Sequence, residues 1–423
     1  MIINIGTNFF EPHEELIYTS EEVINGHWIV LGSSGSGKTH FIRKMVDEMS
    51  KQPGLRIHVL DAHGDITTDP RLTSNCKFSE ASEFGVNPFS LNPDADFGGV
   101  RKRVNQFISM ISRNSGKLGV RQETTLRNLL YDLYKKRGFH HDKPSTWTLT
   151  EDKSFPTMAD LESFIYEKLK TLVVGSSTKA NAALDQLNRL TPNLQKELSK
   201  SANNRDIEKI AKLKESAKSS FCSYVDNLMT GTELDAYIRY DSKDVVKSTF
   251  NRISALTSSG VFKNNPPLFS KSTPIWRYDL TALSDAEKAF LGEIYLEKIF
   301  AACKMRGLCS NNEVHTIVII DEAQLYISAE SDHIINRIFN EARKFGIGIV
   351  FATQNYKAFS ESIIINSGCK LLLGIDAYHH QEVSRKFGVG EKRLKAIQAR
   401  KTGLCQIKGH STYLNNNYHS VVF

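Results

Sequence analysis

Long apolar runs, paired cysteines and a guanine-reading motif are all missing from this 423-residue chain, and each absence excludes a class of protein. The longest apolar runs have the length of a strand, far short of the ~20 residues that a membrane-spanning helix needs. The six cysteines are scattered without a CxxC pair, which is typical of reduced thiols in a cytosolic protein. The first residues contain neither a basic start nor a small-residue cleavage site, so no signal peptide is expected. The sequence therefore predicts a cytoplasmic protein without a membrane span.

Charge is distributed unevenly along the chain. The net charge is +7 at pH 7, yet residues 101–137 hold ten Lys and Arg against two acidic side chains. Residues 381–410 hold eight Lys and Arg against two acidic side chains, so the rest of the chain is net acidic. Such basic segments are either solvated helix faces or phosphate-binding surfaces, and the sequence leaves both interpretations open.

Apolar runs of strand length alternate with helical spacings of apolar residues in the first and last parts of the chain. The runs lie at 27–31, 56–60, 275–280, 316–320, 348–352 and 371–375, and the helical patterns at 39–49, 285–305, 333–344 and 380–387. This alternation predicts an α/β fold with a parallel, doubly wound sheet. Near the end of the chain, 403–408 and 411–414 are expected to pair as a terminal hairpin.

A long, mainly helical stretch interrupts this pattern. Residues 86–260 are expected to form an inserted helical subdomain between a first part of the core, 1–85, and a second part, 261–423. Within the insertion, leucines recur at spacings of three and four residues, which indicates packing between helices. Pro192 is expected to break one of these helices.

The first apolar run ends in a glycine-rich loop that satisfies the pattern GxxxxGK[ST] in full. Its residues are Gly32, Ser33, Ser34, Gly35, Ser36, Gly37, Lys38 and Thr39. Glycines let the backbone turn so that successive N–H groups point at phosphate oxygens, and the following helix adds the positive end of its dipole. Lys38 is expected to reach the β- and γ-phosphates of ATP, and the Thr39 hydroxyl is expected to bind Mg²⁺.

Another buried strand, 316–320, ends in two adjacent carboxylates. In α/β folds ligands bind where strands end, so Asp321 is expected to hold Mg²⁺ through its water shell. Glu322 is expected to orient and deprotonate the attacking water. A carboxylate within the site that can act as a general base favours a hydrolytic motor over a kinase. A GTPase would need an Asn-Lys-x-Asp string, which is absent.

Three further side chains are candidates for catalysis. Gln354 follows the strand 348–352, where its amide is placed to hydrogen-bond the γ-phosphate or the attacking water, although a strand-end cap is the alternative. Arg343, at the end of the preceding helix, is the first candidate for an arginine that a ring neighbour supplies in trans. Arg400 is the second candidate. Either arginine could instead be an exposed helix-terminal charge.

The order of these elements resembles the HerA branch of the HerA/FtsK superfamily, to which the conjugative secretion ATPases are related. The most telling string is Asp61-Ala62-His63-Gly64-Asp65, directly after the second strand. The resemblance implies a RecA-like (ASCE) P-loop ATPase that forms a hexameric ring, with ATP at the subunit interfaces and DNA in a central pore. It also implies that Asp61 and His63 belong to the nucleotide site, that Gln354 is a sensor, and that Arg343 reaches a neighbour's nucleotide.

HerA proteins usually carry a β-barrel before the ATPase, whereas only 26 residues precede His27 here. We therefore expect a motor that lacks this barrel and works with a nuclease or another effector in DNA processing or antiviral defence. The expected activity is ATP hydrolysis coupled to translocation along double-stranded DNA. Two alternatives stay open: a secretion or conjugation-type coupling ATPase, and an ATP-gated scaffold ring that organises an effector enzyme.

Overall fold

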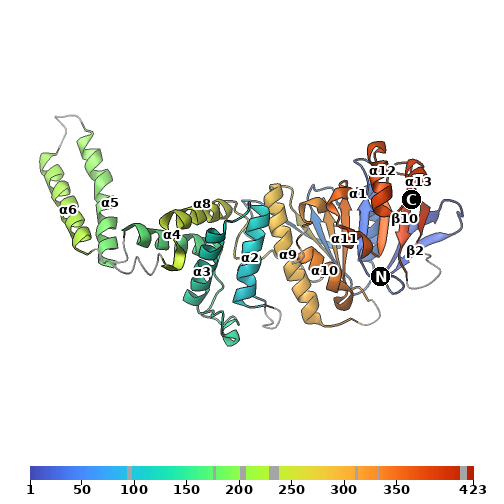
Figure 1. Ribbon diagram of the computed structural model, residues 1–423, viewed down its shortest axis with the longest axis horizontal. Helices are drawn as coiled ribbons and strands as arrows, with labels where there is room; N and C mark the ends of the chain where they lie inside the picture. Colours follow the sequence, from blue (N-terminus) through green and yellow to red (C-terminus); the bar gives the residue numbers. More distant parts are fainter. Residues whose placement is uncertain are drawn as a thin grey trace. The chain divides into compact units, whose positions relative to one another are not determined.

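The chain forms two compact units. Unit 1 comprises Met1–Asn87 and Gly260–Phe423, and unit 2 comprises Pro88–Ser259. The structure is a computed structural model, shown as a ribbon in Figure 1. It describes residues 1–92, 98–174, 178–200, 206–227, 238–309, 313–328, 330, 333–409 and 417–423.

Unit 1 is built on one large sheet. Within the described residues this sheet has 11 strands in the order β2-β1-β11-β10-β9-β3-β8-β7-β4-β6-β5. The strands from β9 to β5 run parallel, while β10, β11, β1 and β2 pair antiparallel. Their bounds are β1 (Ile2–Asn8), β2 (Glu15–Thr19), β3 (Trp28–Leu31), β4 (Arg56–Asp61), β5 (Thr73–Lys77), β6 (Ile275–Asp279), β7 (Thr316–Asp321), β8 (Ile347–Thr353), β9 (Cys369–Leu372), β10 (Thr402–Ile407) and β11 (Tyr418–Val422).

Helices connect the parallel strands of unit 1. They are α1 (Lys38–Ser50), α9 (Asp285–Arg306), α10 (Ile334–Glu341), α11 (Glu361–Ile365), α12 (His380–Phe387) and α13 (Glu391–Lys395), with 3-10 turns η4 (Ala323–Leu325), η5 (Ala342–Phe345), η6 (Tyr356–Ala358) and η7 (Ala377–His379). Successive strand–helix–strand connections in a parallel sheet are the arrangement that the alternating apolar pattern indicates. The predicted α/β fold class is confirmed.

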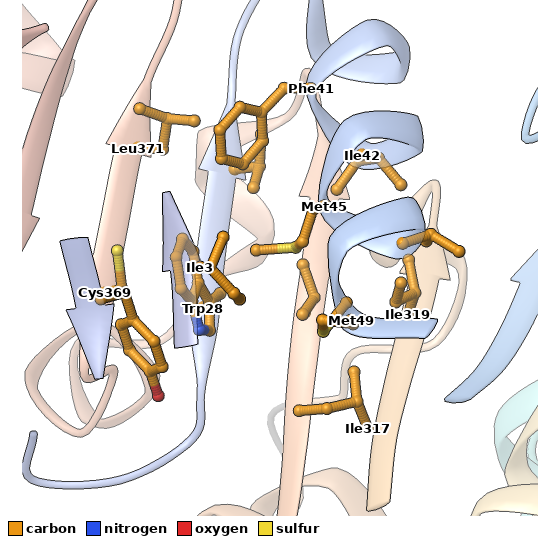
Figure 2. Close-up of a cluster of buried hydrophobic side chains, with 14 of the residues drawn as sticks. Ile3, Trp28, Phe41, Ile42, Met45, Met49, Ile317, Ile319, Cys369 and Leu371 are labelled. Atoms are coloured by element: carbon orange, nitrogen blue, oxygen red, sulfur yellow. The ribbon is translucent and has the colours of Figure 1, made fainter. Parts of the chain in front are cut away.

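The central strands bury both faces because alternate side chains point to opposite sides of the sheet. On one side, Ile317 and Ile319 of β7 belong to the same buried cluster as Met45 and other residues of the apolar stripe of α1 (Figure 2). On the other side, Phe339 of α10 stacks on Phe351 of β8 with ring centroids 5.4 Å apart. The strand ends, and the loops that follow them, are therefore held by packing on both faces of the sheet.

Two antiparallel additions extend the sheet beyond β9. The hairpin β1–β2 was not among the strands that we expected, and Ile3 and Ile5 of β1 are buried in the same cluster as α1. At the other terminus β10 pairs with β11 in an antiparallel ladder. The second strand of the predicted hairpin, 411–414, lies outside the described residues.

Unit 2 is helical in its described residues. Its elements are α2 (Val100–Asn114), α3 (Val120–Lys136), η2 (Pro144–Thr146), α4 (Met158–Val174), α5 (Thr178–Leu198), α6 (Ile207–Asp226) and α8 (Lys243–Thr257). Tyr134 of α3 is fully buried and donates its hydroxyl to the Phe89 carbonyl at 2.6 Å. The described helices of either unit do not combine the length and the apolar content needed to cross a membrane.

The expectation that Pro192 breaks a helix is wrong. Helix α5 continues through Pro192 from Thr178 to Leu198. A proline removes one backbone donor. The neighbouring side chains supply other donors to the helix, because the Thr191 hydroxyl donates to the Leu187 carbonyl at 2.9 Å and Asn193 donates to the Arg189 carbonyl at 3.1 Å. These bonds reach the carbonyls on either side of Asn188, whose own carbonyl loses its intrahelical donor at Pro192.

Candidate functional site

The residues predicted to carry chemistry gather where β3, β4, β7 and β8 end. These four strands run parallel, so their carboxyl ends share one edge of the sheet. The glycine-rich loop follows β3, Asp61 ends β4, Asp321 ends β7, and Gln354 follows β8. This edge of an open α/β sheet is where ligands bind.

The glycine-rich loop is fixed to the neighbouring strand ends. The Gly32 amide donates to the Thr353 carbonyl at 3.3 Å, and the Ser33 amide donates to the Gly374 carbonyl at 2.8 Å. Gly35 and Gly37 have φ angles of 72° and 105°, in the left-handed region that side chains disfavour. The loop conformation therefore depends on glycine at these two positions.

Lys38 and Ser36 present polar groups that suit a phosphate. The Lys38 ammonium donates to the carbonyls of Gly32 and Ser33 at 2.8 and 3.0 Å, so it lies over its own loop. Burial lowers the pKa of Lys38, while the nearby charges of Glu322 and Asp321 oppose this change. The Ser36 hydroxyl is buried and has no hydrogen-bond partner in the described part of the chain. An unpaired buried hydroxyl is costly, and a phosphate oxygen would satisfy it.

A cavity of about 470 Å³ opens beside this loop. The loop and the first turn of α1 line one part of it, and Phe41, Lys44, Arg400 and Phe423 line another. Phe41 and Phe423 meet edge to face with ring centroids 5.7 Å apart. A cavity of this size with aromatic walls and a few cations suits a nucleotide base and ribose next to the phosphates.

Arg400 lies against the glycine-rich loop of its own chain. Its backbone amide donates to the Ser36 carbonyl at 3.1 Å, and its Nε donates to the Gly35 carbonyl at 3.0 Å. Arg400 itself has a φ of 65°, an uncommon conformation for a side chain of this size. These contacts favour a role in cis for Arg400 rather than the trans role that the sequence left open.

Glu322 is held in a defined orientation. Its own backbone has a φ of 54°, which is uncommon outside glycine. Its carboxylate lies 3.3 Å from His63 Nε2 and also accepts a hydrogen bond from the Gln324 amide. The Gln324 carbonyl in turn accepts from the Thr353 hydroxyl. The carboxylate is therefore connected to the ends of β4 and β8.

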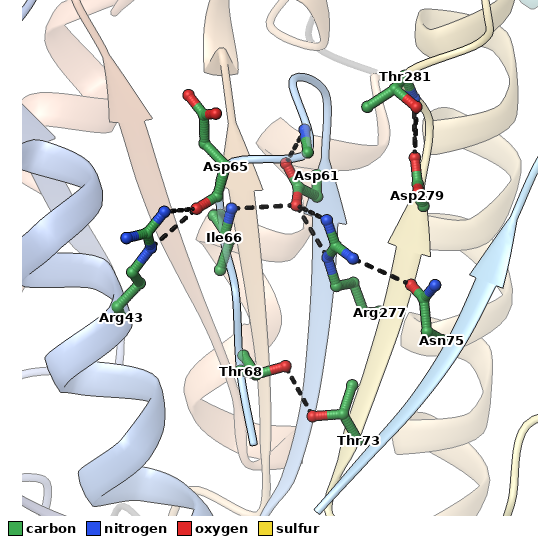
Figure 3. Close-up of polar contacts among 11 residues, drawn as sticks. Arg43, Asp61, Asp65, Ile66, Thr68, Thr73, Asn75, Arg277, Asp279 and Thr281 are labelled. Carbon is green, nitrogen blue, oxygen red and sulfur yellow. Dashed lines mark hydrogen bonds and ion pairs between the residues drawn. The ribbon is translucent and has the colours of Figure 1, made fainter. Parts of the chain in front are cut away.

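Asp61 forms hydrogen bonds and an ion pair that hold the loop carrying His63. Its carboxylate is fully buried and accepts from the amides of Gly64 and Ile66 at 2.8 and 3.1 Å (Figure 3). The Arg277 guanidinium donates to the same carboxylate at 2.6 and 2.9 Å. With four donors, the Asp61 carboxylate positions the loop rather than a ligand, and His63 is the loop residue that reaches Glu322.

The same loop is tied to α1 from its other side. Arg43 of α1 donates through Nε to the Asp65 carbonyl at 2.8 Å (Figure 3). Two arginines, Arg43 and Arg277, thus hold the loop between the helix that follows the glycine-rich loop and strand β6.

The geometry separates Arg343 from the other candidates. Gln354 is exposed and directly follows β8 at the edge that holds the loop. Arg343 is an exposed residue of η5, which precedes β8. Because β8 and β3 run parallel, Arg343 lies at the opposite edge of the sheet from the loop of its own chain. One chain brings together Lys38, Glu322 and His63, but not Arg343.

The donor set fits a magnesium ion better than a protein-bound transition metal. The described residues contain no group of three or more His, Cys, Asp or Glu side chains that could hold a metal ion alone. The Thr39 hydroxyl and the Asp321 carboxylate are hard oxygen ligands. Mg²⁺ is usually bound by one or two such protein ligands, with phosphate oxygens and water completing its octahedron. Thr39 and Asp321 therefore fit Mg²⁺ that arrives with a nucleotide.

Asp321 is poised to lose a proton when a cation binds. Burial raises its pKa from 3.8 to about 6, the charges of Glu322 and Asp61 add to this rise, and His63 opposes it. A carboxyl group with a raised pKa in the folded state makes its largest contribution to stability at low pH. That contribution is lost as the pH rises through about 6.

We expect Asp321→Asn to stabilise the nucleotide-free protein at pH 8, where the wild-type carboxylate is ionised in an unfavourable environment. The shift in the Asp321 pKa corresponds to a gain of about 3 kcal/mol in the free energy of unfolding. Urea titrations of both proteins at pH 8 and pH 5 measure it. The difference should shrink at pH 5, and a variant that is no more stable than wild type at pH 8 would contradict this account of Asp321.

Sequence reasoning missed two residues of this site, Gln324 and Arg277. Gln324 connects Glu322 to Thr353 through hydrogen bonds. Its position two residues after Glu322 was the feature of the sequence that could have pointed to this role. Arg277 neutralises Asp61 from the neighbouring strand β6. The signal for Arg277 was the physical need of a buried carboxylate for a cationic partner.

The chain matches a known family over much of its length. The family is described as "Helicase HerA, central domain", and the match covers residues 13–284, well over half of the chain. A segment of 105 residues is 31% identical to the probable helicase MJECL08 of Methanocaldococcus jannaschii. This segment is 23% of the chain and 20% of that relative, so only a fifth of the relative's length is matched.

Solved structures share the fold. VirB4 of Thermoanaerobacter pseudethanolicus is similar with a TM-score of 0.61 and 13% identity, over 100% of this chain and 96% of VirB4. The plasmid coupling protein TrwB in complex with ADP and Mg²⁺ is similar with a TM-score of 0.53 and 11% identity, over 96% of this chain and 89% of TrwB. At such identities the likeness shows the fold alone, and it confirms the predicted RecA-like (ASCE) P-loop architecture.

Proposed function

The chain belongs to the family of the helicase HerA central domain, a family of P-loop ATPases, and we propose that it hydrolyses ATP to move along double-stranded DNA as a hexameric ring. The observation that supports hydrolysis best is the position of Glu322. Its carboxylate is fixed by His63 and Gln324 at the strand end next to the glycine-rich loop. A carboxylate held at this position can take a proton from an attacking water, which is what a hydrolase needs.

In this proposal each residue of the site has one task. The loop amides and the Ser36 hydroxyl bind phosphate oxygens, and Lys38 exchanges its contacts with the loop carbonyls for the β- and γ-phosphates. Thr39 and Asp321 hold Mg²⁺, which when bound neutralises phosphate charge. Glu322 accepts a proton from the attacking water, and the exposed amide of Gln354 hydrogen-bonds the γ-phosphate or the water and reports its presence.

The place of Arg343 supports the proposed ring. This arginine lies at the opposite sheet edge from its own loop, and we infer that it acts on the nucleotide of a neighbouring subunit. A head-to-tail contact between identical subunits closes into a ring when its rotation allows. The family resemblance supplies six as the number of subunits. It also suggests the cytoplasm as the place of action and a nuclease or a defence effector as the protein partner.

The proposal assigns DNA binding to basic residues of unit 2. In the basic stretch 101–137, four arginines and lysines are ion-paired with carboxylates of unit 2: Arg121, Arg127, Lys136 and Arg137. Arg101 and Lys102 are exposed at the start of α2. We assign contact with DNA phosphates to the start of α2, where these two exposed cations follow each other in the sequence.

We expect the variant with Arg101→Glu and Lys102→Glu to bind duplex DNA more weakly than wild type, whatever the DNA sequence. Each lost phosphate contact should reduce the salt dependence of log K by about 0.9. Fluorescence anisotropy at several salt concentrations measures both quantities. ATP binding should be unchanged, because Lys38 belongs to unit 1.

Reversal of Lys212 and Lys214 on α6 is the matched control, since both are exposed and the change in net charge is the same. Equal weakening by both pairs would mean that net charge alone is responsible. If the α2 variant keeps the wild-type affinity and slope, the start of α2 is a solvated face and DNA contacts lie elsewhere.

A further inference from the structure

A second cavity, of about 450 Å³, lies in unit 1 beside the first residues of β4 and β7. Phe269, Trp276 and Tyr295 are among its aromatic lining residues, and Arg56, Lys298 and Arg306 add three cations. Among the residues that the structure describes, no aspartate or glutamate lines it. This aromatic basic pocket, as we call it, is suited to an apolar or aromatic group that carries a negative charge.

The walls of the aromatic basic pocket are preformed. Trp276 stacks on Phe269 with ring centroids 5.0 Å apart, and the Arg56 guanidinium lies 4.6 Å from the centroid of Trp276. Arg56 also donates to the Lys271 carbonyl at 2.9 Å, which fixes it in place. Arg306, at the end of α9, is exposed at the cavity. A ligand in this pocket would contact packed aromatic side chains and cationic groups.

The β1–β2 turn carries a group with the complementary chemistry. Phe9 and Phe10 expose 50% and 75% of their surface and touch each other edge to face, with ring centroids 5.3 Å apart. Glu11 follows them and is exposed. Two adjacent exposed aromatic rings on a short turn are unusual unless they meet a partner. We call Phe9–Glu11 the knob.

The knob and the aromatic basic pocket lie at opposite ends of one sheet. Strands β2 and β1 form one end of the strand order, while β4, β6 and β5 form the other. A projection at one end and a cavity at the other cannot meet within a subunit. They can meet in a head-to-tail contact between two copies, which is the kind of contact that builds a ring.

The knob is hydrogen-bonded to the strand that precedes Phe423, and the aromatic basic pocket lies near the turn that holds Arg343. The Phe9 amide donates to the Ser420 carbonyl of β11, and Phe423 after that strand lines the nucleotide cavity. On the other side, the end of α9 contacts the turn that holds Arg343. The Cys309 amide donates to the Lys344 carbonyl at 2.9 Å.

We propose that the knob of one subunit docks into the aromatic basic pocket of a second copy of this chain, with Phe10 as the aromatic anchor and Glu11 facing Arg306. The inference rests on the proposed ring and names the contact that closes it. Docking would bring the Arg343 side of one subunit to the nucleotide side of the next. Assembly and ATP turnover would then be coupled through a contact remote from the phosphates.

The first test measures assembly of the full chain by mass photometry with Mg²⁺ and a non-hydrolysable ATP analogue. Phe10→Ser should raise the concentration for half-assembly by about tenfold or more, as expected for an anchor residue. Phe221→Ser on α6 is the matched control, because Phe221 is an exposed aromatic residue (53%) outside both surfaces. Glu11→Arg and Arg306→Glu should each weaken assembly, and the two together in one chain should restore it.

The second test is a covalent one that does not depend on how well a weakened variant folds. In a background with Cys222→Ser, Cys303→Ser and Cys309→Ser, which removes the exposed thiol, the thiol that lines the pocket and a partly exposed thiol, Phe10→Cys combined with Lys298→Cys should form disulfide-linked multimers on oxidation. Either single cysteine alone should not. No ladder from the double variant, or wild-type assembly of Phe10→Ser, overturns the docking contact while leaving the ring intact. A wild-type chain that stays monomeric with the nucleotide overturns the ring and this contact together.

Discussion

Replacing Glu322 by Gln is expected to leave ATP binding intact and to lower ATP turnover by about 10²- to 10⁴-fold, the range typical of a lost general base. The amide has nearly the same shape as the carboxylate, so the contacts with Gln324 and His63 are perturbed little while the proton acceptor is lost. Binding is measured with a fluorescent ATP analogue, and turnover is measured by phosphate release.

Two further variants make this result specific. Lys38→Ala should abolish nucleotide binding, which separates loss of the phosphate contact from loss of the base. Glu361→Gln, at the start of α11, removes an exposed carboxylate away from the site and should turn over ATP normally. Wild-type turnover by Glu322→Gln would mean that another group accepts the proton.

Removal of the Arg343 side chain is expected to have the other large effect. Arg343→Ala should bind ATP nearly as well as wild type and hydrolyse it about 10³- to 10⁵-fold more slowly, the range measured where an arginine in trans stabilises phosphoryl transfer. The reason is geometric, because Arg343 precedes β8 and is remote from the loop of its own chain. Lys344→Ala, the neighbouring exposed cation, is the matched control.

Mixing experiments distinguish a trans role from a cis role. Arg343→Ala and Lys38→Ala subunits are each inactive alone, yet a mixed ring contains interfaces with one intact Lys38 and one intact Arg343. Partial activity should therefore return, with a maximum at intermediate ratios. A complete lack of recovery at every ratio would argue that Arg343 acts on its own chain or plays no part in the reaction.

The strands and helices that the sequence predicted are those whose signal is local. Strands such as β3, β4 and β7 are buried on both faces and appear as continuous apolar runs. The strand β5 (Thr73–Lys77) was missed because it is an edge strand with mostly polar residues, of which only Cys76 is buried. Helix α5 continues through Pro192, although a proline in a helical pattern usually marks a break.

For the candidate site, the sequence supplied the residues but not their partners. The spacing of the glycine-rich loop and the pair Asp321 and Glu322 was readable because each motif is contiguous. Gln324 and Arg277 were not assigned, since their roles arise only when β6, β7 and β8 are placed side by side. The tasks given to these residues in catalysis stay predictions until the variants are measured.

The two candidate arginines also show what a single sequence cannot predict about the site. The sequence ranked Arg343 before Arg400 as a trans arginine, but it could not show where either side chain lies relative to the nucleotide. The fold puts Arg400 on the glycine-rich loop of its own chain, with Nε 3.0 Å from the Gly35 carbonyl, and puts Arg343 at the far edge. Only strand order and direction, which a single sequence does not display, separate a cis from a trans arginine.

The most direct test of the central proposal is displacement of a triplex-forming oligonucleotide from a linear duplex. A motor that moves along double-stranded DNA strips the third strand in its path only while it hydrolyses ATP. The account predicts ATP-dependent displacement by wild type, accompanied by DNA-stimulated phosphate release, and no displacement by Glu322→Gln, which should still bind ATP and DNA. ATP hydrolysis that is not stimulated by duplex DNA and does not displace the third strand would contradict the proposed function.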